Sequence, residues 1–149
     1  MRAVVQRVAD ASVTVGGVTV GAIGPGLVTL VGVKRTDTEA DAQYIAEKTA
    51  NLRVFDDVQG RMNRSLLDTG GSILVVSQFT LLGDVRRGRR PNYMEAAAPE
   101  LAEALYLRVC QLLREQSISV ATGQFGAEMV VQMTGDGPVT ILLDSERQF

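Results

Sequence analysis

The chain carries one segment in which hydroxyl, amide and backbone groups follow an apolar run. Residues 73–76 predict a buried strand, and Ser77, Gln78, Phe79 and Thr80 stand at its end. Polar groups in that position would line a dry cleft, where backbone N–H groups are strong donors to an oxyanion. The same pattern fits a strand end whose hydroxyls satisfy neighbouring backbone groups. The residues alone leave both interpretations open.

A second segment offers backbone carbonyls rather than side chains. Gly137 and Pro138 lie between two apolar runs near the C-terminus, and the proline ring would hold the neighbouring carbonyls in a rigid orientation. Most Gly-Pro pairs form ordinary turns between strands. Only about 5–6% of X-Pro bonds in folded proteins are cis, so the residues by themselves predict a trans peptide here.

The chain of 149 residues contains no histidine and a single cysteine, Cys110. Ser-His-Asp and Cys-His catalysis are therefore excluded, and so is a metal site that depends on imidazole. A hydroxyl without a basic partner is a poor nucleophile at neutral pH, and neither segment contains a lysine. We expect no metal and no cofactor, and a chemistry that uses hydroxyls, carboxylates, backbone groups or the substrate itself.

Length and composition predict an ordinary globular protein. The apolar share is 46%, and residues 1–149 are expected to form one domain with a sizeable core. No apolar run reaches the roughly 18 residues that span a bilayer, and polar residues interrupt the first apolar stretch, unlike a signal peptide. With no intrachain disulfide possible, this pattern favours the cytoplasm. The net charge of −2 argues against a general nucleic-acid binder, so DNA is not an expected partner.

Positive charge is nevertheless concentrated in one place. Arg86, Arg87, Arg89 and Arg90 lie within five positions, shortly after the Ser77–Thr80 segment. Such a cluster is most often a solvated loop. The alternative is contact with phosphate groups, which require cations near them.

Glycine and proline turns separate the expected strands and helices. Gly16 and Gly17 tolerate positive φ and predict a tight hairpin. The spacing of Thr36 and Glu39 matches a capping box and predicts a helix over residues 38–51. Expected strands cover residues 2–8, 11–15, 18–20, 27–33, 72–79, 117–121, 128–134 and 138–143.

A second long helix is expected to begin near Pro99, which suits a first helical turn. Its apolar stripe at helical spacing is Leu101, Leu105, Val109 and Leu112. Residues 82–92 are expected to form an exposed loop. The order of elements predicts one α/β domain in which a mixed, largely antiparallel sheet curls over two main helices.

Four stretches, in order along the chain, resemble the D-aminoacyl-tRNA deacylase family. The signature patterns of that family are Ser-Gln-x-Thr and Gly-Pro-x-Thr, which residues 77–80 and 137–140 match. Residues 1–8 and 122–129 match as well, so the resemblance covers nearly the whole chain. It implies a compact curled sheet that pairs two subunits into a homodimer, and the 3′ end of an aminoacyl-tRNA as partner.

The resemblance implies a role for each residue of the first segment. The backbone amides around Gln78 and Phe79 would stabilise the carbonyl oxygen of the aminoacyl ester, and Thr80 would lie close to the scissile bond. Ser77 would belong to the same catalytic motif. A neighbouring ribose hydroxyl of the substrate would assist at high effective molarity. The residues implied to wall the pocket near the terminal adenosine are Phe125, Gly126, Ala127 and Met129, although their spacing also fits a simple hairpin.

The resemblance also implies that the Gly137-Pro138 peptide is cis and acts in the pocket of the partner subunit. Its carbonyls would accept from the amino group of a D-amino acid or of glycine and would exclude an L side chain. Arg7 would hydrogen-bond to this loop; otherwise Arg7 is a surface residue beside Asp10. The family usually has Asn where this chain has Gly135, so a side chain that often fixes a turn is missing.

Taken with the resemblance, the sequence implies hydrolysis of D-aminoacyl-tRNA and of mischarged glycyl-tRNA, with rejection of L-aminoacyl-tRNA. The arginine cluster would contact phosphates of the acceptor end. Two other functions stay open. One is a module that binds the tRNA 3′ end without catalysis, and the other is a small-ester hydrolase that uses Ser77 or Thr80.

Overall fold

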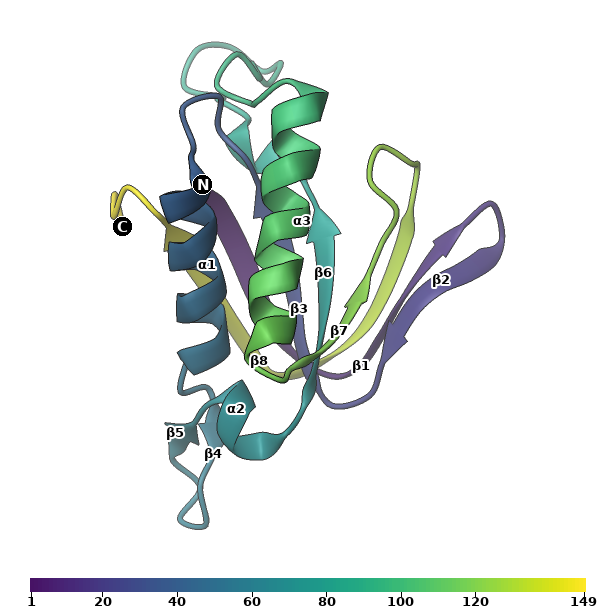
Figure 1. The fold of residues 1–149 in the computed structure, drawn as a ribbon, viewed down its shortest axis with the longest axis vertical. Coiled ribbons are helices and arrows are strands. Elements are labelled where there is room, and N and C mark those ends of the chain that lie inside the picture. The colour runs from purple at the N-terminus through teal and green to yellow at the C-terminus, as the bar shows by residue number, and fades with distance from the viewer.

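Six strands form one mixed sheet, and two long helices cover one of its faces (Figure 1). The computed structural model describes residues 1–149. The strands of this sheet are β1 (Arg2–Val15), β2 (Val18–Ile23), β3 (Gly26–Gly32), β6 (Ser72–Ser77), β7 (Ser119–Thr122) and β8 (Val130–Asp144). The helices are α1 (Glu39–Asn51), α3 (Pro99–Glu115), the short α2 (Leu66–Thr69) and the 3₁₀ turn η1 (Phe79–Leu82). Strands β4 (Phe55–Asp56) and β5 (Met62–Arg64) form a small separate ribbon.

The long strand β1 organises the sheet because it pairs with three other strands. Its first half pairs antiparallel with β3, its second half with β2, and β8 pairs antiparallel with both halves. β3 and β6, and β6 and β7, pair in parallel, so the predicted mixed sheet is confirmed. Gly16 and Gly17 have φ angles of 55° and 80°, which confirms the predicted tight hairpin between β1 and β2.

The sheet curls, and its apolar side chains enter two cores. Ala3 and Val5 of β1 pack in the main core, against side chains of α1 and α3. Farther along β1, Val8, Ala11 and Val13 belong to a second cluster on the other side of the sheet. The register of β1 against β8 shifts on both sides of Val8, where one core gives way to the other. The predicted α/β class and curled sheet are therefore confirmed.

Helix α1 begins with a cap that differs from the predicted one. The N–H and Oγ1 of Thr38 both donate to Oδ2 of Asp41, at 2.8 and 3.0 Å. The capping box predicted for Thr36 and Glu39 is wrong, because the N-cap residue of the helix is Thr38. The carboxylate of Asp37, the residue before the cap, accepts hydrogen bonds from groups outside the helix. Glu39 instead forms an ion pair with Arg108 of α3.

Helix α3 begins at Pro99, as predicted, but its buried face differs from the predicted stripe. Leu101 is exposed and Leu112 is only half-buried. The face turned inward adds Tyr106, Cys110 and Leu113, because α3 packs against both α1 and the sheet, and a single stripe would not cover both contacts. Neither long helix is long and apolar enough to cross a membrane.

Two predicted strands near the C-terminus are one strand. β8 runs from Val130 to Asp144, whereas two strands separated at the Gly-Pro pair were expected. β1 supplies hydrogen-bonding partners on both sides of residues 136–139, so these residues bulge out while the strand continues. The strand predicted to reach residue 79 ends at Ser77, where the chain turns into η1.

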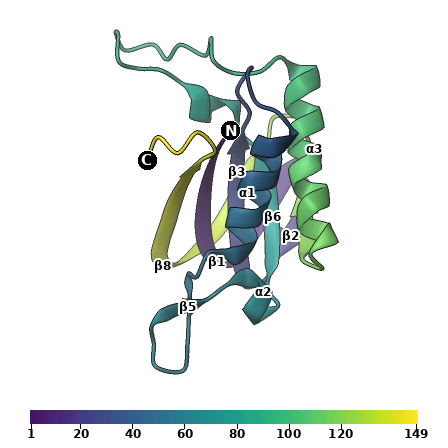
Figure 2. The same ribbon diagram turned by 60° about the vertical axis from the view of Figure 1, so that its left-hand side comes forward.

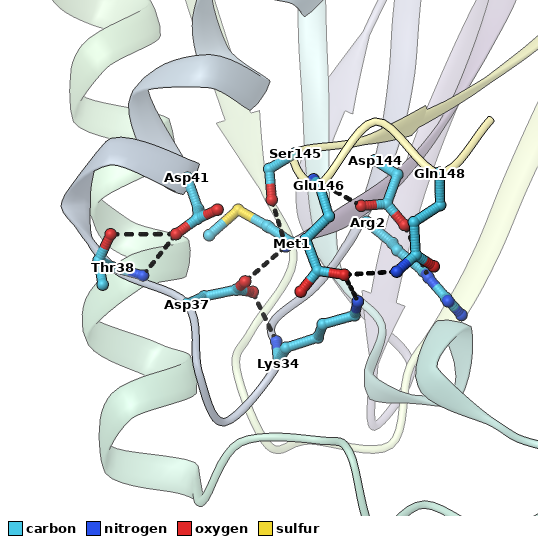
Figure 3. A network of polar contacts seen from close by, with 10 residues as sticks. All are labelled: Met1, Arg2, Lys34, Asp37, Thr38, Asp41, Asp144, Ser145, Glu146 and Gln148. Carbon is cyan, nitrogen blue, oxygen red and sulfur yellow. Dashed lines mark hydrogen bonds and ion pairs between the residues drawn. The ribbon is translucent and has the colours of Figure 1, made fainter.

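A buried polar network ties the first residues to the C-terminal segment and to the loop before α1 (Figure 3). The amino group of Met1 donates to Oδ1 of Asp37 and to Oγ of Ser145, both at 2.6 Å. The other oxygen of Asp37 accepts from the backbone N–H of Lys34 at 2.6 Å, and the Lys34 ammonium pairs with Glu146. Burial raises the pKa of the Asp37 carboxyl, while the nearby ammonium group acts in the opposite direction.

Candidate active site

The ends of β3 and β6 lie beside the first turns of α3 (Figure 1). Residues of these three elements line a cavity of about 560 Å³. It brings together two groups that the sequence placed in one pocket: Ser77 to Phe79 at the end of β6, and Phe125, Gly126, Ala127 and Met129. No charged side chain lines it. The other lining residues are Val31, Val33, Val76, Ala96, Ala97, Pro99, Ala102, Tyr106 and Val131.

The turn that follows β6 begins with Phe79, a residue of the cavity wall whose backbone N–H is a candidate donor. Phe79 opens the turn η1, so its N–H has no acceptor within the turn, and no loop carbonyl or side chain accepts from it. The N–H of Gln78, by contrast, donates to the carbonyl of Val31 at 2.8 Å. The expectation that both amides are available is therefore wrong for Gln78, because β3 lies alongside and uses it. Phe79 carries the donor that is left.

The two hydroxyls of the segment occupy different surroundings. Ser77 is half-buried and lines the cavity, and no basic side chain lines it with Ser77. Thr80 is exposed and lies outside the lining, and its Oγ1 accepts from the side-chain amide of Gln78. Neither hydroxyl therefore has a partner that could remove its proton.

Sequence reasoning missed the wall that α3 supplies. Pro99, Ala102 and Tyr106 line the cavity from one helix face, and their spacing of three and four residues is the signal that predicts a shared face. The hydroxyl of Tyr106 donates to the carbonyl of Val75 at 2.9 Å, and its ring lies 6.0 Å from that of Phe125. Burial raises the pKa of Tyr106 well above its ordinary value, so the phenol stays protonated and is not a base.

A guanidinium group holds the loop at Gly137 and Pro138. The Nε of Arg7 donates to the carbonyl of Asp136 at 3.2 Å and pairs with its carboxylate at 3.1 Å, so the predicted contact between Arg7 and the loop is confirmed. The Nη1 of Arg7 donates to the carbonyl of Val54 at 2.7 Å. The Gly137-Pro138 peptide is cis, as the resemblance implied. Neither residue lines the cavity of its own chain, and both are exposed.

The loop requires glycine at one of its positions and not at the other. Gly137 has a φ of 131°, and an added Cβ would lie 2.8 Å from the backbone nitrogen of Val139. Gly135 lies in open space, with no atom within 4 Å of an added Cβ, and it pairs with Val8 in the strand ladder. The Asn that the family usually has would therefore fit at Gly135, and the strand pairing fixes this end of the loop without it.

The arginine cluster lies on an arm that leaves the body between η1 and α3 (Figure 2). Arg86 is engaged within the arm, since its Nη2 and Nε donate to Asp84 at 2.7 and 2.9 Å. These bonds from Arg86 hold the pKa of the Asp84 carboxyl far below its usual range. Arg87, Arg89 and Arg90 are exposed and form no ion pair in the structure. Three of the four predicted cations are thus free to meet a ligand.

Curated relatives match the chain from end to end, among them the following two. The D-aminoacyl-tRNA deacylase of Symbiobacterium thermophilum is 60% identical over 149 residues, covering 100% of this chain and 99% of that protein. The D-aminoacyl-tRNA deacylase of Bacillus velezensis is 57% identical over 147 residues, covering 99% of this chain and 100% of that protein.

Solved structures that are similar to this one include the following two. A protein described as "c-Myc DNA Unwinding Element Binding Protein" has a TM-score of 0.91 at 42% identity, covering 97% of this chain and 98% of its own. A second, described as a probable eukaryotic D-amino acid tRNA deacylase, has a TM-score of 0.81 at 20% identity, covering 95% and 97%, and shows the shared fold alone.

The family model described as D-Tyr-tRNA(Tyr) deacylase matches residues 4–144, nearly the whole chain. Both signature segments lie inside that match: one ends the strand that reaches the cavity, and the other forms the bulge that Arg7 holds. On the length of the match and the identity of the relatives, the chain belongs to the D-Tyr-tRNA(Tyr) deacylase family.

Proposed function

We propose that this protein hydrolyses the ester bond between a D-amino acid and tRNA, releasing free tRNA and the amino acid. Glycine mischarged on a non-cognate tRNA is a second substrate, because glycine has no side chain to reject. L-aminoacyl-tRNA is excluded, so the reaction removes wrongly charged tRNA before translation uses it. The enzyme therefore works in the cytoplasm, where translation takes place.

The observation that carries this proposal is an uncharged cavity with a free backbone donor at its wall, the N–H of Phe79. Water attacks the ester carbonyl carbon, and the N–H of Phe79 stabilises the oxyanion that forms. The ribose oxygen then leaves with a proton, and the vicinal ribose hydroxyl of the substrate assists at high effective molarity. A cavity without a basic side chain suits this mechanism, because the vicinal ribose hydroxyl of the substrate gives the assistance that no side chain of the cavity can give.

Selectivity for the D-amino acid comes from a second copy of the chain. We infer a homodimer in which the loop at Gly137 and Pro138 enters the partner's cavity. Three features support this arrangement: the loop is exposed, it lies outside its own cavity, and Arg7 holds it through a side chain that is only 10% exposed. The loop carbonyls accept from the amino group of a D-residue and leave no room for an L side chain.

Matched pairs of D- and L-aminoacyl-tRNA test the proposed function. We expect the D-ester to disappear faster than its spontaneous rate and the L-ester to be spared. A module that only binds the tRNA 3′ end would cleave neither ester. A general esterase would cleave both, or would prefer simple esters.

Removal of either hydroxyl is expected to leave most of the activity. Ser77→Ala and Thr80→Ala should each retain kcat within about tenfold of the unmodified enzyme, because no side chain in the cavity activates an attacking hydroxyl. Single-turnover hydrolysis of D-aminoacyl-tRNA measures this. A trapped acyl-enzyme, or a loss of about 10³-fold from one substitution, would establish nucleophilic catalysis instead.

Mixing two impaired variants tests whether the loop acts in the partner's cavity. Gly137→Ala strains the loop, because its φ of 131° disfavours a side chain, and Ala102→Phe fills the cavity. Each variant should be slow by itself. After the two are unfolded and refolded together, half of the dimers are mixed, and each mixed dimer has one intact cavity facing one intact loop. Activity should then recover to about a quarter of the unmodified level.

The control is each variant refolded alone, together with sedimentation to establish the dimer. If the mixture never exceeds the sum of the separate variants while mixed dimers form, the loop serves its own chain. A monomer at catalytic concentrations would refute the arrangement directly.

A further inference from the structure

An aromatic pair joins the cavity to the arginine arm. Phe79 lines the cavity, and its ring meets the ring of Tyr93 edge to face, with the ring centres 5.1 Å apart and the planes at 70°. Both rings reach solvent, since Phe79 is 58% exposed and Tyr93 is 37% exposed. Large aromatic surfaces that remain exposed next to a cavity mouth indicate contact with a ligand.

The base of the arm holds Tyr93 in place. Asp84 and Asn92 exchange two backbone hydrogen bonds of 2.8 and 2.9 Å, which close the arm just before Tyr93. The backbone carbonyl of Tyr93 accepts from the N–H of Ala96 at 3.0 Å. An added Cβ at Gly83 would lie 3.0 Å from the Tyr93 ring, so the ring packs directly on this backbone. A ring held in this way loses little freedom when a flat ligand stacks on it.

Charge on the arm identifies the kind of ligand. Residues 84–94 carry four arginines and a single aspartate, and the carboxylate of Asp84 bonds only to Arg86. Exposed aromatic rings beside unpaired arginines are the arrangement with which proteins bind single-stranded nucleic acid, the rings stacking on bases and the cations meeting phosphates.

We propose that Tyr93, supported by Phe79, is a stacking surface for the unpaired nucleotide that precedes the terminal adenosine, while Arg87, Arg89 and Arg90 contact the phosphates near it. The inference rests on the proposed function for the identity of the RNA. The terminal adenosine and its amino acid occupy the cavity, and the chain of the RNA leaves past Phe79, which lines the cavity, toward Tyr93 at the base of the arm. The unpaired 3′ end is thereby held in an extended path outside the catalytic cavity.

Binding of an RNA that carries no amino acid tests this proposal without hydrolysis. The probe is a fluorescent RNA minihelix with the unpaired 3′ end of tRNA and no amino acid, compared with a blunt minihelix of the same stem. Tyr93→Leu, which keeps the apolar bulk but removes the flat ring, should weaken binding to the first probe roughly 5- to 100-fold. Tyr93→Phe and Tyr93→Trp keep a ring and should bind as the unmodified protein does. Binding to the blunt probe should not change.

The contribution of the arginines is measured separately, from the dependence of Kd on salt concentration. Changing Arg87, Arg89 and Arg90 together to Gln should lower the slope of log Kd against log salt by about 2, at roughly 0.7 for each phosphate of a single strand. Arg61→Gln is the matched control, because Arg61 is an exposed arginine between β4 and β5, at the opposite end of the molecule (Figure 1). It should leave the slope unchanged.

Three outcomes would overturn the proposal. If Tyr93→Leu and the unmodified protein bind the RNA probe with equal affinity, Tyr93 is not a stacking surface. Equal loss on the blunt probe would show a folding defect or a duplex contact instead. Tighter binding of single-stranded DNA than of the RNA probe would assign the arm to DNA. Because the probe carries no ester, an unmodified protein that binds it but cleaves no aminoacyl-tRNA would refute the proposed function and leave this inference standing.

Discussion

Replacing Phe79 by proline is expected to lower kcat for D-aminoacyl-tRNA by about 10²- to 10³-fold relative to Phe79→Ala. Proline is the one natural residue that removes the backbone N–H, and here that N–H is the donor left free at the cavity. The site accepts proline, because Phe79 is the first residue of a 3₁₀ turn and Gln78, with φ −146° and ψ 82°, lies outside the helical region.

The comparison with Phe79→Ala separates the donor from the ring. Both variants lose the aromatic side chain, and hence its contact with Tyr93, but only the proline variant loses the N–H. Single-turnover rates at saturating substrate report the chemical step, and thermal unfolding confirms that both variants fold. Equal kcat for the two variants would mean that the Phe79 N–H does not stabilise the transition state.

Gly32→Ala is expected to lower kcat about 100-fold, although Gly32 does not line the cavity. An added Cβ at Gly32 would lie 2.8 Å from the carbonyl oxygen of Gln78 and 3.0 Å from Cβ of Leu81. Backbone atoms cannot rotate away as a side-chain tip can, so η1 must shift as a unit. The donor at Phe79 then leaves its position, and the crowding should also lower the free energy of unfolding by about 1–3 kcal/mol.

Gly24→Ala is the matched control for this substitution. Gly24 lies in the turn between β2 and β3, and no atom comes within 4 Å of its added Cβ. It should therefore retain kcat and stability. Separate values of kcat and KM distinguish displacement of the donor, which lowers kcat, from loss of substrate binding, which raises KM. Full activity in a well-folded Gly32→Ala protein would show that η1 tolerates displacement, and that the Phe79 donor is not positioned as argued.

Gly32 also illustrates how closely the active-site strand end depends on its neighbours. Three contacts hold the turn η1. The N–H of Gln78 donates to the carbonyl of Val31 in β3, and the carbonyl of Leu81 accepts from Arg2 at 3.2 Å. The backbone of Gly32 also packs closely against Gln78 and Leu81. Arg2 in turn pairs with Asp144 of β8 at 3.3 Å. The position of one backbone N–H is thus set by residues from both ends of the chain.

Several local features of this protein can be predicted from short stretches of its sequence. The Gly16-Gly17 hairpin and the start of α3 at Pro99 follow from the conformational preferences of a few adjacent residues. The absence of histidine excludes imidazole as a base or a metal ligand, whatever the fold. The matched motifs also placed Phe125, Gly126, Ala127 and Met129 at the pocket, and these four residues line the cavity together with Ser77.

Tertiary structure decided which backbone groups are free and which segments continue. The N–H of Gln78 is occupied only because β3, distant in sequence, lies beside it. β8 continues past the Gly-Pro bulge because β1 pairs with it on both sides, whereas a local pattern of glycine and proline predicts a break. Tyr106 enters the cavity because α3 packs at the ends of β3 and β6. Each outcome depends on contacts between segments far apart in the chain, and hydrogen-bond partners of that kind leave no signal in a short window of sequence.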